Sequence, residues 1–205
     1  ESITQISEFD HVDFDFETLS TKDSTDLRPE EWEEFAAYIN KRQKDFDAIV
    51  CTHGTDTLAY TSTAMSFAFY QPETRGSALF TPVVFTGSQL PIQDVGSDGE
   101  KNLISAIRTS LDADQKNITD VLIAFDNVVI QAVKAYKTSD HNFNAFDAVD
   151  GMRIGTISAM GVKLNNADMA ITSSSIHRQQ MRATYNPDKP PPNGKFVLNV
   201  DNDSA

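Results

Sequence analysis

The stretch AIVCTHGTDTL, from Ala48 to Leu58, decides the fold of this chain. Its first four residues form an apolar run that predicts a short buried strand, and the run stops abruptly at six polar or small residues. From Leu58 to Tyr70 the sequence is rich in small and apolar residues, a composition typical of a packed helix. The stretch therefore predicts a strand, a polar turn and a helix in immediate succession.

The same unit occurs again further along the chain. The apolar run from Pro82 to Phe85 predicts a second strand, which ends in the polar residues Thr86 to Gln89. After a loop, Ser97 to Glu100 have the spacing of a capping box, which predicts a helix from Lys101 to Leu111. The run from Val121 to Phe125 predicts a third strand of the same kind.

Strands that alternate with helices at this spacing predict an α/β fold. We expect right-handed crossovers and a mostly parallel sheet with helices on both faces. In open sheets of this kind, ligands bind beyond the carboxyl ends of the strands, which is where the polar turns lie. A helix is also predicted from Pro29, because proline suits a first helical position and Trp32, Phe35 and Ile39 then share one face.

The pattern changes after Gly151. Two short strands are predicted, from Met152 to Ile157 and from Lys195 to Val200. Residues Tyr185 to Gly194 contain four prolines and predict a loop that ends in an Asn-Gly turn. We expect residues 1–200 to form one α/β domain that is incomplete at its N-terminus. Residues 201–205 are expected to be a cut end or the start of a linker to a further domain.

Composition narrows the classes of partner. With 205 residues and 40% apolar content, one well-packed domain is expected. The net charge of −13 argues against nucleic acid or an anionic membrane, and favours a small molecule or a protein. The chain has no run of about 18 apolar residues and no secretion signal at its start, so we expect a soluble chain. The lone cysteine, Cys51, lies in an apolar run and is predicted to be a small buried hydrophobe.

The polar turn after the first strand carries the strongest candidate for chemistry. Residues Thr52 to Thr57 contain three threonines, a histidine, a glycine and an aspartate, directly before a helix whose free backbone N–H groups can bind an anion. A threonine hydroxyl needs a nearby lysine or carboxylate before it can react. Threonine and aspartate are also common helix N-caps, so capping remains an alternative reading of these residues.

No metal or cofactor is predicted. His53 has no second histidine at metal-ligand spacing, and His11, His141 and His177 are scattered along the sequence. We therefore expect His53 to support packing or hydrogen bonding rather than chemistry.

Four ordered motifs in the chain resemble the bacterial-type L-asparaginases, in particular the type I branch. They are THGTDT from Thr52, VFTGSQLP from Val84 with SDG from Ser97, DSTDL from Asp23 with PEEW from Pro29, and Lys137 six residues before FNAF. The resemblance covers about Ser24 to Phe146. It implies the N-terminal domain of that family, a Rossmann- or flavodoxin-like arrangement.

The resemblance also implies a site. Thr55, Asp56 and Lys137 would form a catalytic Thr–Lys–Asp triad, in which a buried lysine with a lowered pKa accepts the threonine proton. A further set, which includes Thr55 and Asp56, would bind the substrate: Ser24, Thr25, Gly54 and Ser88. Taken alone, Lys137 is typical of a surface lysine, Ser24 and Thr25 of a turn, and Asp98 of a capping box.

The implied activity is hydrolysis of L-asparagine, and possibly L-glutamine, through a threonine acyl-enzyme without a cofactor. The family resemblance implies a cytoplasmic homodimer or homotetramer. Two departures qualify it: no TGGTI-like turn with the nucleophilic threonine precedes Ser24, and no C-terminal domain follows. A smaller one is Ala132 to Lys134, where the family commonly has a glycine and an arginine. Either the intact protein is longer, which we favour, or the chain is a relative that has lost hydrolysis.

Two rival functions remain open. One is the asparaginase-like, ammonia-generating subunit of a tRNA-dependent amidotransferase. The other is a non-catalytic module that binds aspartate or asparagine.

Overall fold

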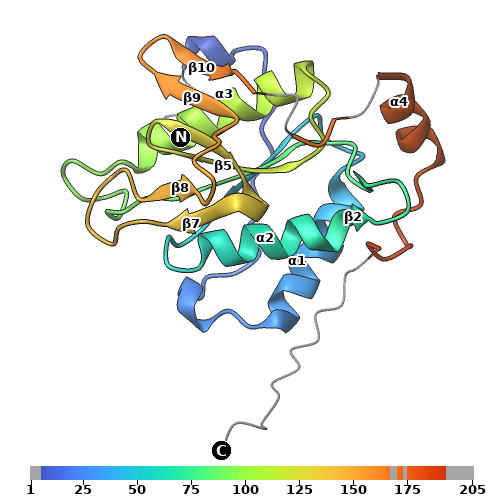
Figure 1. The fold of residues 1–205 in the computed structure, drawn as a ribbon, viewed down its shortest axis with the longest axis horizontal. Helices are drawn as coiled ribbons and strands as arrows, with labels where there is room; N and C mark the ends of the chain where they lie inside the picture. Colours follow the sequence, from blue (N-terminus) through green and yellow to red (C-terminus); the bar gives the residue numbers. More distant parts are fainter. Residues whose placement is uncertain (1–5, 167–169, 173–174, 193–205) are drawn as a thin grey trace, which may run out of the picture.

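The computed structural model describes residues 6–166, 170–172 and 175–192. Its centre is a six-stranded sheet with helices packed against it (Figure 1). The strand order is β1 (Ile49–Thr52), β4 (Val83–Thr86), β5 (Val121–Phe125), β6 (Val128–Gln131), β9 (Gly155–Ser158) and β10 (Gly161–Leu164). The three strands predicted between Ala48 and Phe125 are all present, each shifted by no more than one residue at either end.

The sheet is mixed, with most strands pointing the same way. β1, β4 and β5 are parallel neighbours. β6 runs antiparallel to β5, β9 antiparallel to β6, and β10 antiparallel to β9. Because β9 is antiparallel to β6, which is itself antiparallel to β5, β9 points in the same direction as β5. The predicted mostly parallel α/β sheet is therefore confirmed, with β6 and β10 as the exceptions.

Helices cover both faces of the sheet, as predicted. They are α1 (Pro29–Arg42), α2 (Leu58–Phe69), α3 (Gly99–Gln115) and the outlying α4 (Ser175–Thr184). Side chains alternate across the strands, so Val83 and Phe85 pack in one core cluster with α1 and α2. Val84 packs in a second cluster with α3. Figure 1 shows α1 and α2 together and α3 apart from them.

One prediction about the crossovers is wrong. The chain passes from β1 through α2 to β4, and then through α3 to β5, moving in one direction across three parallel strands. Since α2 and α3 cover opposite faces, these two crossovers have opposite hands and cannot both be right-handed. α2 packs in one core cluster and α3 in the other, so each helix buries its apolar side on a different face of the sheet.

The helix after the second strand begins differently from the prediction. α3 starts at Gly99 and continues to Gln115, four residues beyond the expected end. The predicted capping box is absent. The N-cap residue is Asp98, and its side chain makes no capping hydrogen bond to the first turn of the helix. Instead the Ser97 hydroxyl accepts a hydrogen bond from the Gly99 N–H at 3.1 Å, and Asp98 turns toward another loop.

Several short elements were not anticipated. β7 (Ala135–Lys137) and β8 (Phe146–Ala148) form a hairpin, and β2 (Tyr70–Gln71) pairs with β3 (Gly76–Ser77). The described residues also contain three short 3₁₀ helices: η2 (Ser7–Phe9), η3 (Ser24–Asp26) and η4 (Ala132–Lys134). The hairpin matters most for the site, because it carries Lys137.

The described C-terminal part agrees with the sequence predictions only in part, because β10 and α4 were not predicted. The strand expected from Met152 is β9, which begins at Gly155. Residues 185–192 contain no helix, as the prolines predicted. The Asn-Gly turn, the strand expected from Lys195 and the end at 201–205 lie outside the described residues.

Two further features concern the described residues. None of their helices has the length and apolar character that a membrane crossing requires. Cys51 packs against the α1–α2 core cluster, and burial raises the pKa of its thiol to about 12. The thiol is therefore protonated at neutral pH, in keeping with the expected role as a small hydrophobe.

Candidate active site

The polar loops that follow β1 and β4 touch each other backbone to backbone. The His53 N–H donates a hydrogen bond to the Thr86 carbonyl at 2.9 Å, which continues the parallel ladder past the end of both strands. A Cβ placed on Gly87 would lie 2.2 Å from the His53 carbonyl oxygen. Only glycine allows this approach, so Gly87 brings the two loops together at the carboxyl edge of the sheet.

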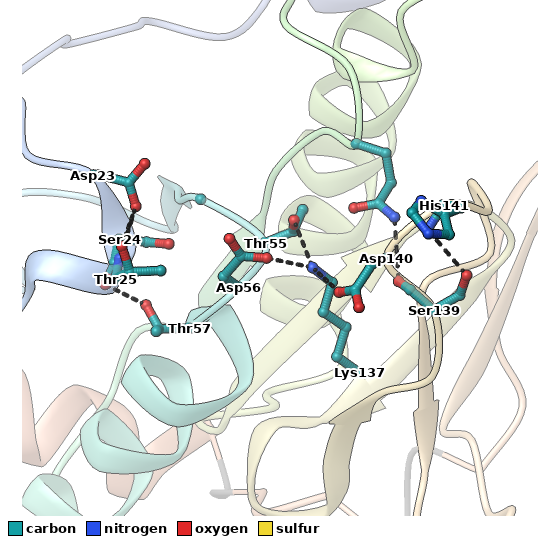
Figure 2. A network of polar contacts seen from close by, with 12 residues as sticks. Asp23, Ser24, Thr25, Thr55, Asp56, Thr57, Lys137, Ser139, Asp140 and His141 are labelled. Carbon is teal, nitrogen blue, oxygen red and sulfur yellow. Dashed lines mark hydrogen bonds and ion pairs between the residues drawn. The ribbon is translucent and has the colours of Figure 1, made fainter.

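Thr55, Asp56 and Lys137, the three residues that the family resemblance grouped, converge at this edge (Figure 2). The Lys137 Nζ lies 3.2 Å from the Thr55 Oγ1 and 2.5 Å from an Asp56 carboxylate oxygen. Thr55 and Asp56 are adjacent in the turn before α2, whereas Lys137 comes from the hairpin strand β7, about 80 positions further along the chain. A hydroxyl, an ammonium and a carboxylate therefore share one small volume.

The electrostatics of Lys137 differ from the expectation of a lowered pKa. Its side chain is only 16% exposed, and this desolvation favours the neutral amine. Hydrogen bonds and ion pairs with Asp56 and with Asp140, 2.9 Å away, favour the ammonium and outweigh the desolvation. The pKa of Lys137 is raised as a result, so the side chain is an ammonium at neutral pH.

Ser24 and Thr25 lie in η3 beside the same turn, but they play different structural roles. Ser24 is buried against Gly54, where a Cβ would lie 2.6 Å from the Ser24 Oγ. The Thr57 hydroxyl donates to the Ser24 carbonyl at 2.7 Å and ties η3 to the start of α2. Thr25 is exposed, and its hydroxyl and N–H both donate to Asp23 at 2.8 and 2.9 Å. Figure 2 shows this pair to one side of the Lys137 cluster.

Ser88 follows β4 in the loop that touches the first turn, and it is partly buried. The neighbouring Gln89 makes the contacts that connect this loop to the hairpin. Its side-chain amide donates to the carbonyls of Ser139 and Asn142 at 3.2 and 3.0 Å. Gln89 therefore links the β4 loop to the loop that follows Lys137.

Asp98, at the start of α3, is hydrogen-bonded to the backbone of the loop that follows β4. Its carboxylate, 8% exposed, accepts hydrogen bonds from the backbone N–H groups of Gln89 and Leu90 at 2.9 and 3.2 Å. It also accepts one from the Asn102 side chain at 2.9 Å. A buried carboxylate satisfied by three donors is a structural support for the loop rather than a helix cap.

Replacing Asp98 with Ala is expected to lower the free energy of unfolding by about 3 kcal/mol, because three buried donors lose a charged acceptor. Urea unfolding monitored by circular dichroism measures the effect. Glu100→Ala, on the same helix but exposed, serves as the control and should change stability by less than about 0.5 kcal/mol. Equal losses in both variants would contradict the role given to Asp98.

The His53 ring is packed within the turn after β1. Its ring lies 6.2 Å from that of Phe85, and its Nδ1 is 2.8 Å from the Gly54 carbonyl. Burial lowers the pKa of the imidazole and keeps it neutral. Among the described residues, no group of three or more His, Cys, Asp or Glu side chains is placed to hold a metal ion.

Sequence reasoning missed two residues of this site, Asp140 and Gln89. Asp140 pairs with Lys137 across a turn of the β7–β8 loop, and Gln89 clamps that loop. Gln89 belongs to the VFTGSQLP motif, but nothing in the composition of that motif indicates a contact 50 residues away. The polar run after Lys137 was the available signal for Asp140.

The fold and the cluster define a mixed α/β domain with a hydroxyl, an ammonium and a carboxylate gathered at the carboxyl edge of its parallel strands. The chain belongs to the asparaginase family. The family model described as "Asparaginase, N-terminal" matches residues 1–170. This confirms the resemblance given by the four sequence motifs.

Individual relatives support the same assignment. An L-asparaginase of Thermococcus kodakarensis is 37% identical over 62% of this chain and 36% of its own length. The D subunit of a glutamyl-tRNA(Gln) amidotransferase of Archaeoglobus fulgidus is 29% identical over 76% of the chain and 35% of its own length. The crystal structure of a probable cytoplasmic L-asparaginase from Campylobacter jejuni aligns with a TM-score of 0.70 at 28% identity, over 80% of this chain and 50% of that one. The chain thus spans about a third of the length of these curated relatives.

Proposed function

We propose that this chain forms the substrate-binding and proton-transfer part of a site that hydrolyses L-asparagine to L-aspartate and ammonia. The observation that carries the proposal is the contact of the Lys137 Nζ with both Thr55 and Asp56. A lysine held between a hydroxyl and a carboxylate has a path for a proton from the hydroxyl and a counter-ion for its charged form.

Each group has a proposed task. Once deprotonated, Lys137 takes the proton of the Thr55 hydroxyl, and Thr55 in turn deprotonates the water that attacks the acyl-enzyme. The Asp56 carboxylate, 57% exposed, binds the α-ammonium of the amino acid with one oxygen while the other faces Lys137. Ser24 and Thr25 bind the α-carboxylate, for which the Thr25 hydroxyl and N–H exchange Asp23 for the substrate. Gly54 and Ser88 complete the proposed substrate-binding set.

The acyl-enzyme needs a nucleophilic threonine, which we place outside residues 1–205 because they contain no TGGTI-like turn. Its oxygen would bond to the side-chain amide carbon of asparagine while the amide nitrogen leaves, with one added proton, as ammonia. Water would then cleave the ester and release aspartate. No cofactor takes part in either step.

The direct test is to supply the whole protein with L-asparagine and measure ammonia release, with L-glutamine as a competing substrate. We expect release from asparagine. Light scattering of the same sample tests the proposed homodimer or homotetramer, and cell fractionation tests the proposed cytoplasmic location. Absence of ammonia from either amide would contradict the hydrolase.

Replacing Asp56 with Asn is expected to weaken L-aspartate binding by roughly 10–100-fold, because the α-ammonium loses a charged hydrogen bond worth about 1.5–3 kcal/mol. Isothermal titration calorimetry gives the two dissociation constants. Asp112→Asn is a matched control, since Asp112 also pairs with a lysine but lies on α3. Unchanged affinity in the Asp56 variant would exclude the assigned contact.

Two outcomes point to other functions. Ammonia release that depends on a tRNA-loaded partner would indicate the amidotransferase, a reading favoured by the similarity to the Archaeoglobus D subunit. The net charge of −13 makes direct RNA contact by this chain unfavourable. Binding of L-aspartate by the whole protein without hydrolysis of either amide would indicate an amino-acid-sensing module.

A further inference from the structure

Lys137 has a second carboxylate partner, Asp140, which the proposed proton transfer does not use. The two charged groups are 2.9 Å apart, and the Asp140 side chain is 76% exposed while that of Lys137 is 16% exposed. The ammonium therefore lies between Asp56 on one side and Asp140 on the other, with the Thr55 hydroxyl as third neighbour (Figure 2). In this arrangement the lysine carries its proton and cannot accept another.

The position of Asp140 is fixed by the loop around it. The Ser139 hydroxyl accepts hydrogen bonds from the N–H groups of His141 and Asn142 at 3.1 and 3.0 Å, which closes a tight turn over residues 139–142. Gln89 then holds this turn through the carbonyls of Ser139 and Asn142. The turn that carries Asp140 is therefore held against Lys137 by hydrogen bonds from Gln89, in the loop that follows β4.

The charges around Lys137 set its protonation. Asp56 faces it from the turn before α2, and Asp140 faces it from its own hairpin. His141 lies near Asp140, and the contact with Lys137 lowers the pKa of Asp140, so that carboxylate is ionised at neutral pH. An ionised carboxylate at this distance favours the ammonium, because the two charges attract.

We propose that Asp140 is a positioning residue of the site, which holds the Lys137 ammonium jointly with Asp56 and so sets the pH above which Lys137 can accept the Thr55 proton. The effect on catalysis rests on the proposed function. The effect of Asp140 on the protonation of the Lys137 amine can be measured without any turnover.

The test compares Asp140→Asn with Asp150→Asn in the whole protein. Asp150 is the matched control, because it is exposed and pairs with Lys134 at 2.8 Å near the other end of the same hairpin. Trace acetylation of lysine amines over a range of pH, followed by mass spectrometry of the peptide containing Lys137, gives the titration midpoint of that amine. We expect the midpoint to fall by about one pH unit in Asp140→Asn, the low end of the usual range because Asp140 is largely exposed.

The control variant and Asp140→Glu, which keeps a carboxylate, should leave the Lys137 midpoint within about 0.3 pH units of the parent. An unmoved midpoint in Asp140→Asn, or an equal shift in Asp150→Asn, would overturn the inference whether or not the protein hydrolyses asparagine. With an active protein, the ascending limb of the pH–kcat profile should move to lower pH by the same amount, because the Lys137 ammonium of the variant loses its proton at a lower pH. A labelling shift without hydrolysis would refute the proposed function alone.

Discussion

Replacing Lys137 with Met is expected to lower the turnover number for L-asparagine by about 10²–10⁴-fold, the usual contribution of a general acid–base group. Met fills a similar volume but carries no titratable nitrogen, so the Thr55 hydroxyl loses the group that takes its proton at 3.2 Å. The same change leaves the Asp56 carboxylate without its partner at 2.5 Å. Ammonia release under saturating asparagine measures the effect.

The control for this variant is Lys134→Met. Lys134 lies three residues earlier in η4 and pairs with Asp150, so the substitution removes an ion-paired lysine close by in sequence but outside the cluster. We expect its turnover number to stay within about twofold of the parent, the range of a surface substitution away from the site. Turnover in Lys137→Met equal to that of the control would exclude the relay.

Replacing Gly87 with Ala is expected to lower the free energy of unfolding by about 4 kcal/mol or more, among the largest effects of a single substitution. The new methyl group would lie 2.2 Å from the His53 carbonyl oxygen and 3.4 Å from the Leu58 side chain. A backbone atom cannot rotate away as a side chain does, so the loops after β1 and β4 must separate. Chemical denaturation of the parent and the variant gives the difference.

Gly76→Ala is the matched control for this substitution. Its added methyl group would meet the Thr74 hydroxyl at 3.2 Å, the end of a flexible side chain that can turn aside. We expect a change below about 1 kcal/mol. If Gly87→Ala proved as stable as this control, the close contact between the two loops would not hold the edge of the sheet together.

The sequence predicted the β1–β4–β5 core well because local signals agreed with one another there. Each strand is a short apolar run that ends at polar residues. β4 and β5 are fully buried between the two core clusters, and β1 is partly buried. Pro29 and the one-sided apolar pattern placed α1 correctly for the same reason. These features depend on neighbours within about four residues, which a sequence displays directly.

The antiparallel half of the sheet was less visible. β5 and β6 are joined by Asp126 and Asn127 alone, and Asp126 adopts a positive φ of 49°. Two turn-forming residues between two apolar runs are a hairpin signal, but the apolar pattern beyond Asn127 was not read as a strand. The opposite hands of the two crossovers had no local signal, since they depend on which face each helix packs against.

The candidate site divides in the same way. The sequence by itself determined the residue types at the strand ends and, through the family resemblance, the choice of Thr55, Asp56 and Lys137. Only the tertiary structure decided that Asp140 also faces the lysine, that Gln89 clamps its loop, and that the amine is an ammonium rather than a neutral base. The physical reason is range: strand, turn and helix preferences act between neighbours along the chain, whereas Asp56 meets Lys137 from 81 positions away and Gln89 holds the Asp140 turn from 50 positions away. Asp140 is only three residues from Lys137, but the turn that places it against the amine is held by that distant contact.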